Sequence, residues 1–315
     1  PMFIRWSDQD DYTSWTASAT NSAGSQRVTG GSKIVTAVST RGQILFLTDT
    51  SAHGMSFIGA PFTFGFQKLG TNCGAVSPHC AVDISGIIYW MSSDGFYMFD
   101  GTVRKMPCTV EDFVFDNIDS TQLEQVYAGS NSAFGEVIWF YCSTSSNQID
   151  RYVIFNYQEK LWYTGSLDRS TWIDSGTYPL PYATEYDGTD SLLYVHESGT
   201  DDDGSTMTSF IESGDFDVGD GDQMMFVKKG IQDFKDQVGN VNISLKSRYY
   251  PTDTQTTKGP FYLSTTTQRF NPRTRGRQVA VRIESNGYNG SSNDALSENW
   301  RLGTLRFEVQ PDGMR

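Results

Sequence analysis

The sequence predicts an all-β protein, with β-propeller-like blades over residues 1–200 and a C-terminal β-sandwich-like domain over residues 201–315. Three observations predict this fold class. Aromatic residues make up 14% of the 315 residues, and flat rings fit the pleated surface of a sheet. Thirty glycines, with many serines and threonines, supply turns. A unit of an apolar strand, a short turn and a second strand recurs along the first two thirds of the chain.

The repeated unit occurs four times. Its apolar strands start at Ile44, Ile87, Val137 and Leu192, which are 43, 50 and 55 residues apart. A period of about 40 to 55 residues with several strands in each unit is typical of a β-propeller. One four-stranded blade cannot bury both of its faces alone, whereas stacked blades can. The alternative is an ordinary β-sandwich with long loops.

Within these units we expect strands at 42–49, 86–91, 96–100, 136–142, 151–156 and 191–196. Asp94-Gly95 is a strong hairpin turn between the second and third of them. The segment 113–126 breaks the pattern, and its Thr121 and Glu124 fit a capping box. We therefore expect one short helix between blades there, and helix in less than about 12% of the chain.

The expected domain boundary lies in the polar, glycine-containing stretch 199–205. Beyond it, apolar and polar residues alternate as in half-buried antiparallel strands. These strand-like runs lie at 210–211, 224–227, 241–245, 279–283 and 305–309. The threonine-rich segment 252–267 is expected to form an exposed hairpin or arm.

The charge and the cysteines narrow the function classes. A net charge of −13 repels phosphate, so tight nucleic-acid binding by the whole molecule is not expected. The acidity is compatible with a passive conduit for DNA, or it serves only solubility. The four cysteines lack the close spacing of a zinc site and are expected to be reduced: Cys73, Cys80, Cys108 and Cys142.

No run of about 18 apolar residues predicts a membrane span. The chain starts at Pro1, with no signal peptide before its first motif. It is therefore expected to be a processed or truncated piece of something longer.

The sequence predicts no catalytic site, no cofactor and no metal required for folding. The three histidines, His53, His79 and His196, have no partner at metal-ligand spacing, and no nucleophile elbow or phosphate loop occurs. Three pairs of carboxylates could hydrolyse a glycoside, but the preference of Asp for turns is the favoured explanation for them. They are Asp94 with Asp100, Asp150 with Glu159, and Asp187 with Glu197.

Two clusters of charge are candidate contact sites. Arginines gather late in the chain, and Arg273, Arg275 and Arg277 could form bidentate pairs with carboxylates of a partner or neighbouring subunit. Asp201, Asp202 and Asp203 provide an acidic counterpart. The alternative for each cluster is a solvated loop. Calcium binding is a less favoured hypothesis than a solvated acidic loop, because the EF-hand spacing is absent. The residues that could bind calcium are the 201–203 run, or Asp215, Asp217, Asp220 and Asp222.

Several strings of residues, spread in order over nearly the whole chain, together resemble one protein family. They are Ile4-Arg5-Trp6-Ser7-Asp8-Gln9, Tyr89 to Tyr97, Glu136 to Tyr141 followed by Asp150-Arg151-Tyr152-Val153, Ile211-Glu212-Ser213, Asp217 to Gly221, Arg275-Gly276-Arg277-Gln278, Trp300-Arg301-Leu302-Gly303 and Pro311 to Arg315. The chain resembles the tail nozzle family of podoviruses, short-tailed bacteriophages, which is also called tail tubular protein B or the tail hub.

The resemblance implies a structural virion protein that bears a β-propeller and assembles as a hexamer below the head-to-tail adaptor. The ring would prolong the channel for genomic DNA, without sequence-specific binding, and would dock tail fibres or a tail tip. Its place would be the virion tail, assembled in the bacterial host cytoplasm. Members are often longer, so this chain is expected to be the C-terminal half or a compact variant. The alternative function is a carbohydrate-binding or carbohydrate-cleaving propeller at a cell surface.

Overall fold

The computed structural model describes the whole chain except residues 187, 206, 220, 286–297 and 314–315. The described residues form antiparallel sheets, one α-helix of seven residues, α1 (Glu111–Asn117), and one 3-10 turn, η1 (Leu123–Gln125). This confirms the all-β prediction. The chain divides into two compact units, unit 1 (Pro1–Glu197) and unit 2 (Ser198–Arg315). The sequence-based boundary lay at 200/201.

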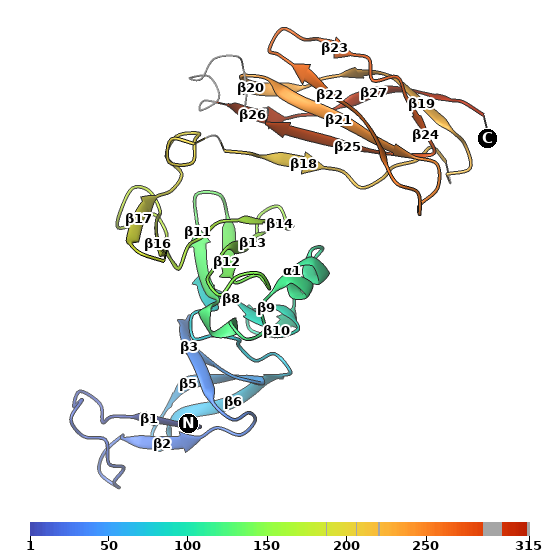
Figure 1. Cartoon of the computed structure of the whole chain (residues 1–315). Helices are drawn as coiled ribbons and strands as arrows, with labels where there is room; N and C mark the ends of the chain where they lie inside the picture. Colours follow the sequence, from blue (N-terminus) through green and yellow to red (C-terminus); the bar gives the residue numbers. More distant parts are fainter. Residues whose placement is uncertain (187, 206, 220, 286–297, 314–315) are drawn as a thin grey trace. The chain divides into compact units, whose positions relative to one another are not determined.

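Unit 1 contains a series of four sheets in which every strand pairs with the next along the chain (Figure 1). Such meanders form where apolar runs alternate with short turns of glycine and polar residues. The first two sheets consist of β3 (Ile34–Thr40), β4 (Gln43–Thr48), β5 (Ser51–Gly59) and β6 (Thr63–Thr71), then β7 (Ala81–Ile84), β8 (Ile87–Ser92), β9 (Gly95–Phe99) and β10 (Val103–Lys105).

The third sheet also has four strands, whereas the fourth has three among the described residues. They consist of β11 (Tyr127–Asn131), β12 (Glu136–Tyr141), β13 (Arg151–Asn156) and β14 (Leu161–Ser166), then β15 (Thr171–Ile173), β16 (Tyr182–Tyr186) and β17 (Ser191–Val195). The six strands expected from the sequence in this unit all coincide with strands of these sheets to within one or two residues.

The first strands of the four sheets lie next to one another in order. β7 lies beside β3 and β11, and β11 lies beside β15. A parallel bridge between His79 and Tyr127 joins the second and third sheets, and the Ala128 N–H donates to the His79 carbonyl at 2.7 Å. These first strands begin at residues 34, 81, 127 and 171, so the structural period is 47, 46 and 44 residues. It is more regular than the spacing of the apolar strands.

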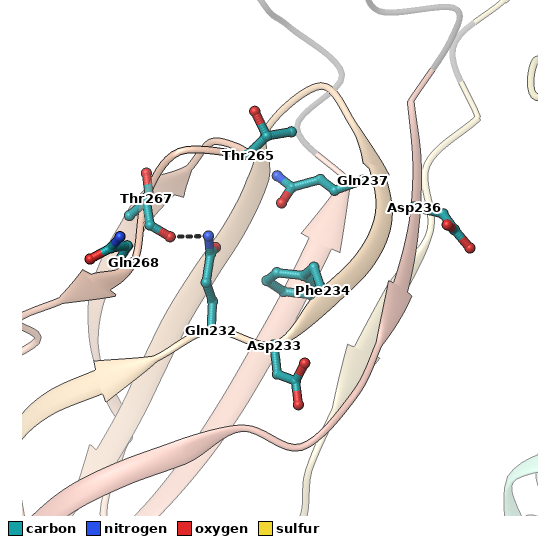
Figure 2. Close-up of a pocket in the computed structure, with 8 residues that line it drawn as sticks. All are labelled: Gln232, Asp233, Phe234, Asp236, Gln237, Thr265, Thr267 and Gln268. Atoms are coloured by element: carbon teal, nitrogen blue, oxygen red, sulfur yellow. Dashed lines mark hydrogen bonds between the residues drawn. The ribbon is translucent and has the colours of Figure 1, made fainter.

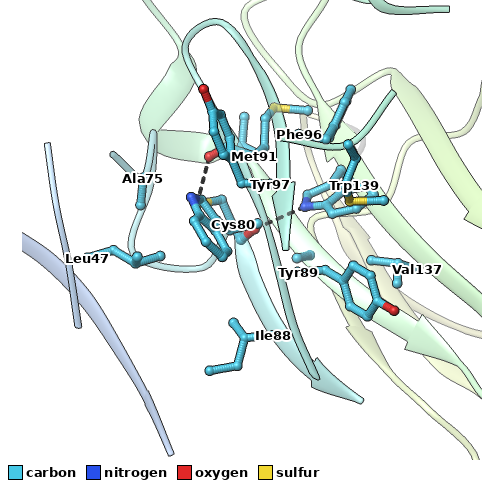
Figure 3. Close-up of a cluster of buried hydrophobic side chains, with 14 of the residues drawn as sticks. Leu47, Ala75, Cys80, Ile88, Tyr89, Met91, Phe96, Tyr97, Val137 and Trp139 are labelled. Atoms are coloured by element: carbon cyan, nitrogen blue, oxygen red, sulfur yellow. Dashed lines mark hydrogen bonds between the residues drawn. The ribbon is translucent and has the colours of Figure 1, made fainter. Parts of the chain in front are cut away.

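One core joins the first three sheets (Figure 3). Trp90 and Trp139 are fully buried in it. Their indole N–H groups donate to the carbonyl oxygens of Cys73 at 2.9 Å and Cys80 at 3.0 Å. A buried indole needs such an acceptor, because an unpaired polar group in a core is costly. These two bonds tie the sheets to the segment 73–80 that links them.

The outer face of the first sheet is covered by a short hairpin, β1 (Phe3–Trp6) paired with β2 (Gly24–Arg27). Met2 and Val28 pack with Phe46 and Met55 in a separate small core. The fourth sheet packs on the third through buried Trp172 and Ala183, among other residues.

Unit 2 encloses its own core. One sheet has the order β18 (Phe210–Glu212), β25 (Gln278–Ser285), β21 (Val241–Arg248) and β22 (Thr256–Leu263). In the other, β19 (Met225–Ile231) pairs with β23 (Arg269–Phe270), β24 (Thr274–Gly276) and β27 (Arg306–Pro311). Side chains from β19, β21 and β25 fill the core. A third pair, β20 (Phe234–Val238) with β26 (Asn299–Leu302), completes the described strands of this unit.

One expectation about local structure needs correction. The helix α1 begins and ends earlier than the expected segment suggested, and Thr121 with Glu124 does not form a capping box. Instead the Asp119 carboxylate accepts from the Thr121 N–H and hydroxyl, both at 2.8 Å, in a local turn. The segment 252–267 carries the mostly exposed edge strand β22, which pairs with β21 in an antiparallel hairpin, so the expectation of an exposed hairpin there is confirmed. In the described chain no helix is long and apolar enough to cross a membrane.

Candidate interaction surfaces

The three predicted arginines lie along β24 and its flanks in unit 2. Arg273 and Arg275 are exposed and alternate with buried Thr274 and Gly276, so the strand presents them outward. The Arg275 guanidinium pairs with Asp312 of the same chain. The guanidinium carbon of Arg277 lies 5.4 Å from the centre of the Tyr250 ring. Arg273 has a φ of 48° and forms no ion pair with any described residue.

Asp201, Asp202 and Asp203 form an exposed turn at the start of unit 2. The Asp201 carboxylate accepts from the Gly204 N–H at 2.8 Å, and Asp202 and Ser205 form an isolated bridge. Within the described residues no ion pair joins this turn to the arginines of β24. The structure therefore does not bring the two predicted charge clusters together within one chain.

The other acidic candidates are dispersed. Asp215 pairs with Arg248 and accepts a hydrogen bond from Gln255, and Asp220 lies outside the described residues. The described part of the chain contains no group of three or more potential metal ligands.

The carboxylate pairs suggested for glycoside hydrolysis have structural partners. Asp94 accepts a hydrogen bond from Tyr97 at 3.1 Å, while Asp100 pairs with Arg104. Asp150 accepts from the Ser143 hydroxyl at 2.6 Å, Glu159 is exposed, and Asp187 lies outside the described residues.

The histidines and cysteines occupy structural positions. His53 is buried on β5, stacked on Phe46 with ring centres 5.3 Å apart, and lies 2.9 Å from the Ser51 hydroxyl. Burial lowers the pKa of His53.

The cysteines are free thiols. Cys73, Cys80 and Cys142 are buried, and burial raises the pKa of the half-buried Cys108 to about 11. None of these thiols has the lowered pKa of a reactive nucleophile.

A buried charge network holds the fourth sheet, and no motif in the sequence predicts it. Arg169 is 5% exposed. Its guanidinium pairs with Glu185 at 2.5 Å and donates to His196 at 2.9 Å. The same group lies 4.1 Å from the centre of the Tyr194 ring. A buried charge with this many partners fixes the position of the strands around it, since removing one partner would leave the charge uncompensated.

A second group of polar residues joins the third sheet to Glu197, which the sequence suggested in a pair with Asp187 and not with Glu136. Tyr163 donates to the Glu136 carboxylate at 3.0 Å, and buried Asn131 donates to Glu197 at 2.9 Å. Burial raises the pKa of Glu136, and the charge of Glu197 adds to the rise. A carboxyl group with a raised pKa beside a second carboxylate is an arrangement that acid–base chemistry can use.

Unit 2 has a polar cavity of about 600 Å³ beside β20 (Figure 2). Its wall includes the Gln232 side chain, whose amide donates to the carbonyl oxygens of Ser264, at 3.1 Å, and of Thr267. Asp233 accepts from the Thr304 N–H at 3.1 Å. The lining residues are Gln232, Asp233, Phe234, Asp236, Gln237, Thr265, Thr267 and Gln268.

Unit 1 also exposes two apolar surfaces that sequence reasoning missed. The first, the hairpin tip, is the β5–β6 turn with Phe57 71%, Ile58 55% and Phe62 73% exposed. The second, the outer sheet face, is the side of the fourth sheet that carries Ile173 56%, Leu193 67% and Val195 46% exposed. Large contiguous apolar patches on a folded protein mark interaction sites, whereas scattered exposed apolar residues are ordinary.

Comparisons with known proteins identify no family. No family model and no curated protein matches the chain. One solved structure that resembles it is described as a glycoside hydrolase. That chain is 8% identical, the similarity covers 78% of this chain and 80% of the other, and the TM-score is 0.25. A similarity at this level supports no conclusion about fold or function.

Proposed function

We propose that this chain is a non-enzymatic structural protein of a short-tailed bacteriophage, of the tail nozzle type. The observation that supports the proposal most is where the quoted family-like motifs fall. Tyr89 to Tyr97 spans the β8–β9 hairpin, Glu136 to Tyr141 is β12, and Trp300 to Leu302 lies in β26. These motifs therefore belong to the frameworks of both units rather than to one isolated loop.

In this proposal the four stacked sheets of unit 1 are propeller-like blades. Their sequential meanders and the contacts between their first strands support this interpretation. Unit 2 is the β-sandwich-like domain, supported by two sheets that share one core. The fold lends itself to assembly, because stacked sheets have two ends at which further surfaces can dock.

The proposed assembly is a hexameric ring below the head-to-tail adaptor, in the virion tail, put together in the bacterial host cytoplasm. It prolongs the channel through which genomic DNA is ejected and docks the tail fibres or the tail tip. The net charge of −13 suits such a channel, since an acidic wall does not retain phosphate. The ring needs no cofactor.

The three arginines at and beside β24 test the electrostatic part of the proposal. Replacing Arg273, Arg275 and Arg277 together with Glu should weaken assembly strongly at an ionic strength of about 0.01–0.05 M. The screening length is then greater than about 10 Å, so charges on neighbouring copies still act on one another. Rim charges mainly change association rates and salt sensitivity. Sedimentation velocity of the full chain measures the effect.

The matched control reverses three exposed arginines of unit 1, Arg5, Arg27 and Arg41, to Glu, which changes the net charge equally. Assembly should be affected less in this control. Equal sedimentation of the β24 variant and the wild type at low salt would show that the cluster is only solvated.

The second candidate function is carbohydrate cleavage at a cell surface, which the Glu136–Glu197 group favours. Hydrolysis needs a carboxylic acid with a raised pKa and a second carboxylate. Incubation of the purified chain with bacterial surface polysaccharides should release no reducing sugar if the structural proposal holds. Sugar release that disappears in both Glu136→Gln and Glu197→Gln would instead establish the enzyme.

A further inference from the structure

The polar cavity of unit 2 lies between two segments that are far apart in the sequence (Figure 2). One wall is the segment 232–237, which includes most of β20, and the other is the segment 265–268 between β22 and β23. The Phe234 ring in the first wall is half-buried and is held by Trp300, with ring centres 5.8 Å apart in an edge-to-face contact. The volume of about 600 Å³ is in the range of pockets that hold small organic ligands.

Backbone carbonyl groups hold two glutamine side chains of the first wall in place. The Gln232 amide nitrogen donates to two carbonyl oxygens within the segment 264–267. The Gln237 amide nitrogen donates to the carbonyl oxygens of Gly239 at 3.0 Å and Leu263 at 2.8 Å. A side-chain amide has two N–H groups, so both donors of each glutamine are used within the protein. Only the amide oxygens, which are acceptors, remain.

These two oxygens lack donors. The Gln232 oxygen is enclosed in the wall and has no hydrogen-bond partner among the described residues. The Gln237 oxygen likewise accepts no hydrogen bond from the described part of the chain. An enclosed acceptor without a donor costs free energy. The wall therefore suits a ligand that brings several hydrogen-bond donors.

The charges around the cavity argue against ionic ligands. Asp233 pairs with Arg306 at 3.5 Å, and Asp236 pairs with Arg301 at 3.6 Å. No lysine or arginine is among the described lining residues, so the wall has no cation for a phosphate or carboxylate ligand. Nor does the described chain bring together three acidic, histidine or cysteine side chains for a metal ion. Amide oxygens, threonine hydroxyls and one aromatic ring remain to contact a ligand.

We propose that this cavity binds a neutral saccharide. Its hydroxyl groups donate to the amide oxygens of Gln232 and Gln237 and exchange hydrogen bonds with the Thr265 hydroxyl. The apolar C–H face of the sugar ring packs on Phe234. A few placed polar groups around an aromatic ring are typical of small-molecule sites.

This inference goes beyond the proposed function. The site belongs to unit 2, so it is distinct from the Glu136–Glu197 group of unit 1 and needs no bond cleavage. It requires neither a ring nor the arginines of β24. Saccharide binding would add recognition of a glycan to the structural role of the chain.

Saturation-transfer NMR of the full-length protein tests the proposal. The neutral probes are maltose, lactose and N,N′-diacetylchitobiose, and the anionic probes are glucuronate and inorganic phosphate, whose competition is read from the sugar signals. The wild type should transfer saturation to the ring protons of at least one neutral disaccharide and not to glucuronate, and phosphate should not compete. The method detects weak binding and works for an assembled ring as well as for a monomer.

Two variants locate the binding. Gln237→Leu removes an acceptor at similar size and should weaken binding about fivefold, as expected for one lost hydrogen bond. Thr265→Lys places a long charged side chain in the lining and should abolish binding. Thr266→Lys is the matched control, because Thr266 is an exposed neighbour that does not line the cavity. It should bind like the wild type, and circular dichroism checks that each variant is folded.

Three results would overturn the saccharide site and leave the nozzle proposal standing. They are no transfer to any of the neutral disaccharides, equally strong transfer to glucuronate, or binding that survives unchanged in both Gln237→Leu and Thr265→Lys. Binding that is lost in Glu136→Gln but kept in Thr265→Lys would also overturn it and would assign the saccharide to unit 1. Sedimentation of the same variants reports on the ring separately.

Discussion

At the residue scale, single buried polar contacts tie the sheets together. The Trp139 indole reaches from the third sheet to the carbonyl of Cys80 in the segment before the second, and Arg169 connects three groups of the fourth sheet. The aromatic runs of the sequence predicted buried strands, and Trp139 was expected on one. Its acceptor could not be predicted, because the donor and acceptor lie 59 residues apart.

Trp139→Ala should lower the free energy of unfolding by about 3–5 kcal/mol, because it removes a fully buried indole and leaves a cavity. Trp15→Ala is the matched control, since Trp15 is 46% exposed, and should cost less than about 1 kcal/mol. Urea unfolding followed by circular dichroism measures both. Equal losses in the two variants would contradict the assignment of Trp139 to the central core.

Glu136 should make stability depend on pH. Its pKa in the folded protein is raised above the ordinary value of 4.5 by burial. The folded state therefore holds this proton more tightly than the unfolded state, and the stability this provides is complete below about pH 4.5. It is lost as the pH rises through the raised pKa.

Glu136→Gln should accordingly be more stable than the wild type at pH 7, with the difference shrinking toward pH 4. Thermal unfolding across this range measures it. Glu124→Gln, at a side chain 78% exposed, should show no such pH-dependent difference. A Glu136→Gln variant that is less stable at pH 7 than at pH 4, relative to the wild type, would reverse the assigned direction.

At the element scale, apolar runs between glycine turns predicted the inner strands well. The strand at 151–156 has the bounds expected from the sequence, and the expected strand at 136–142 differs by one residue from β12.

Other elements could not be predicted from the sequence. The short strand β15 was missed because it has three residues and only one of them, Trp172, is buried. β6 was missed because Gly65 and Gly70 interrupt its apolar pattern. The outer sheet face was missed because strand register across β15–β17 is a long-range property.

The third and fourth sheets approach closely at Gly129 in β11. A methyl group there would lie 2.6 Å from Cδ1 of Trp172, so Gly129→Ala should cost about 1–3 kcal/mol of stability through overpacking. The cost should be smaller when Trp172 is also replaced with Leu, because the ring that the methyl group meets is then gone. A double-mutant cycle in urea measures this coupling. Additive effects would show that the two residues do not press on each other.

At the scale of the whole molecule, the sequence predicted the class of fold and two groups of strands, but not the surfaces at which the molecule could assemble. The arginines at and beside β24 were expected to face a partner, yet Arg275 pairs with Asp312 within the chain. Composition reports how much charge and apolar area a chain has. Where these gather depends on which strands become neighbours, as for Phe62 at a turn and Leu193 on a sheet face.

The central claim is that this chain forms the ring of a phage tail nozzle, and electron microscopy of the purified full-length protein tests it most directly. The account predicts closed rings of six copies with a central opening wide enough for a DNA duplex. Class averages that show only single particles, or open filaments without a central opening, would contradict it.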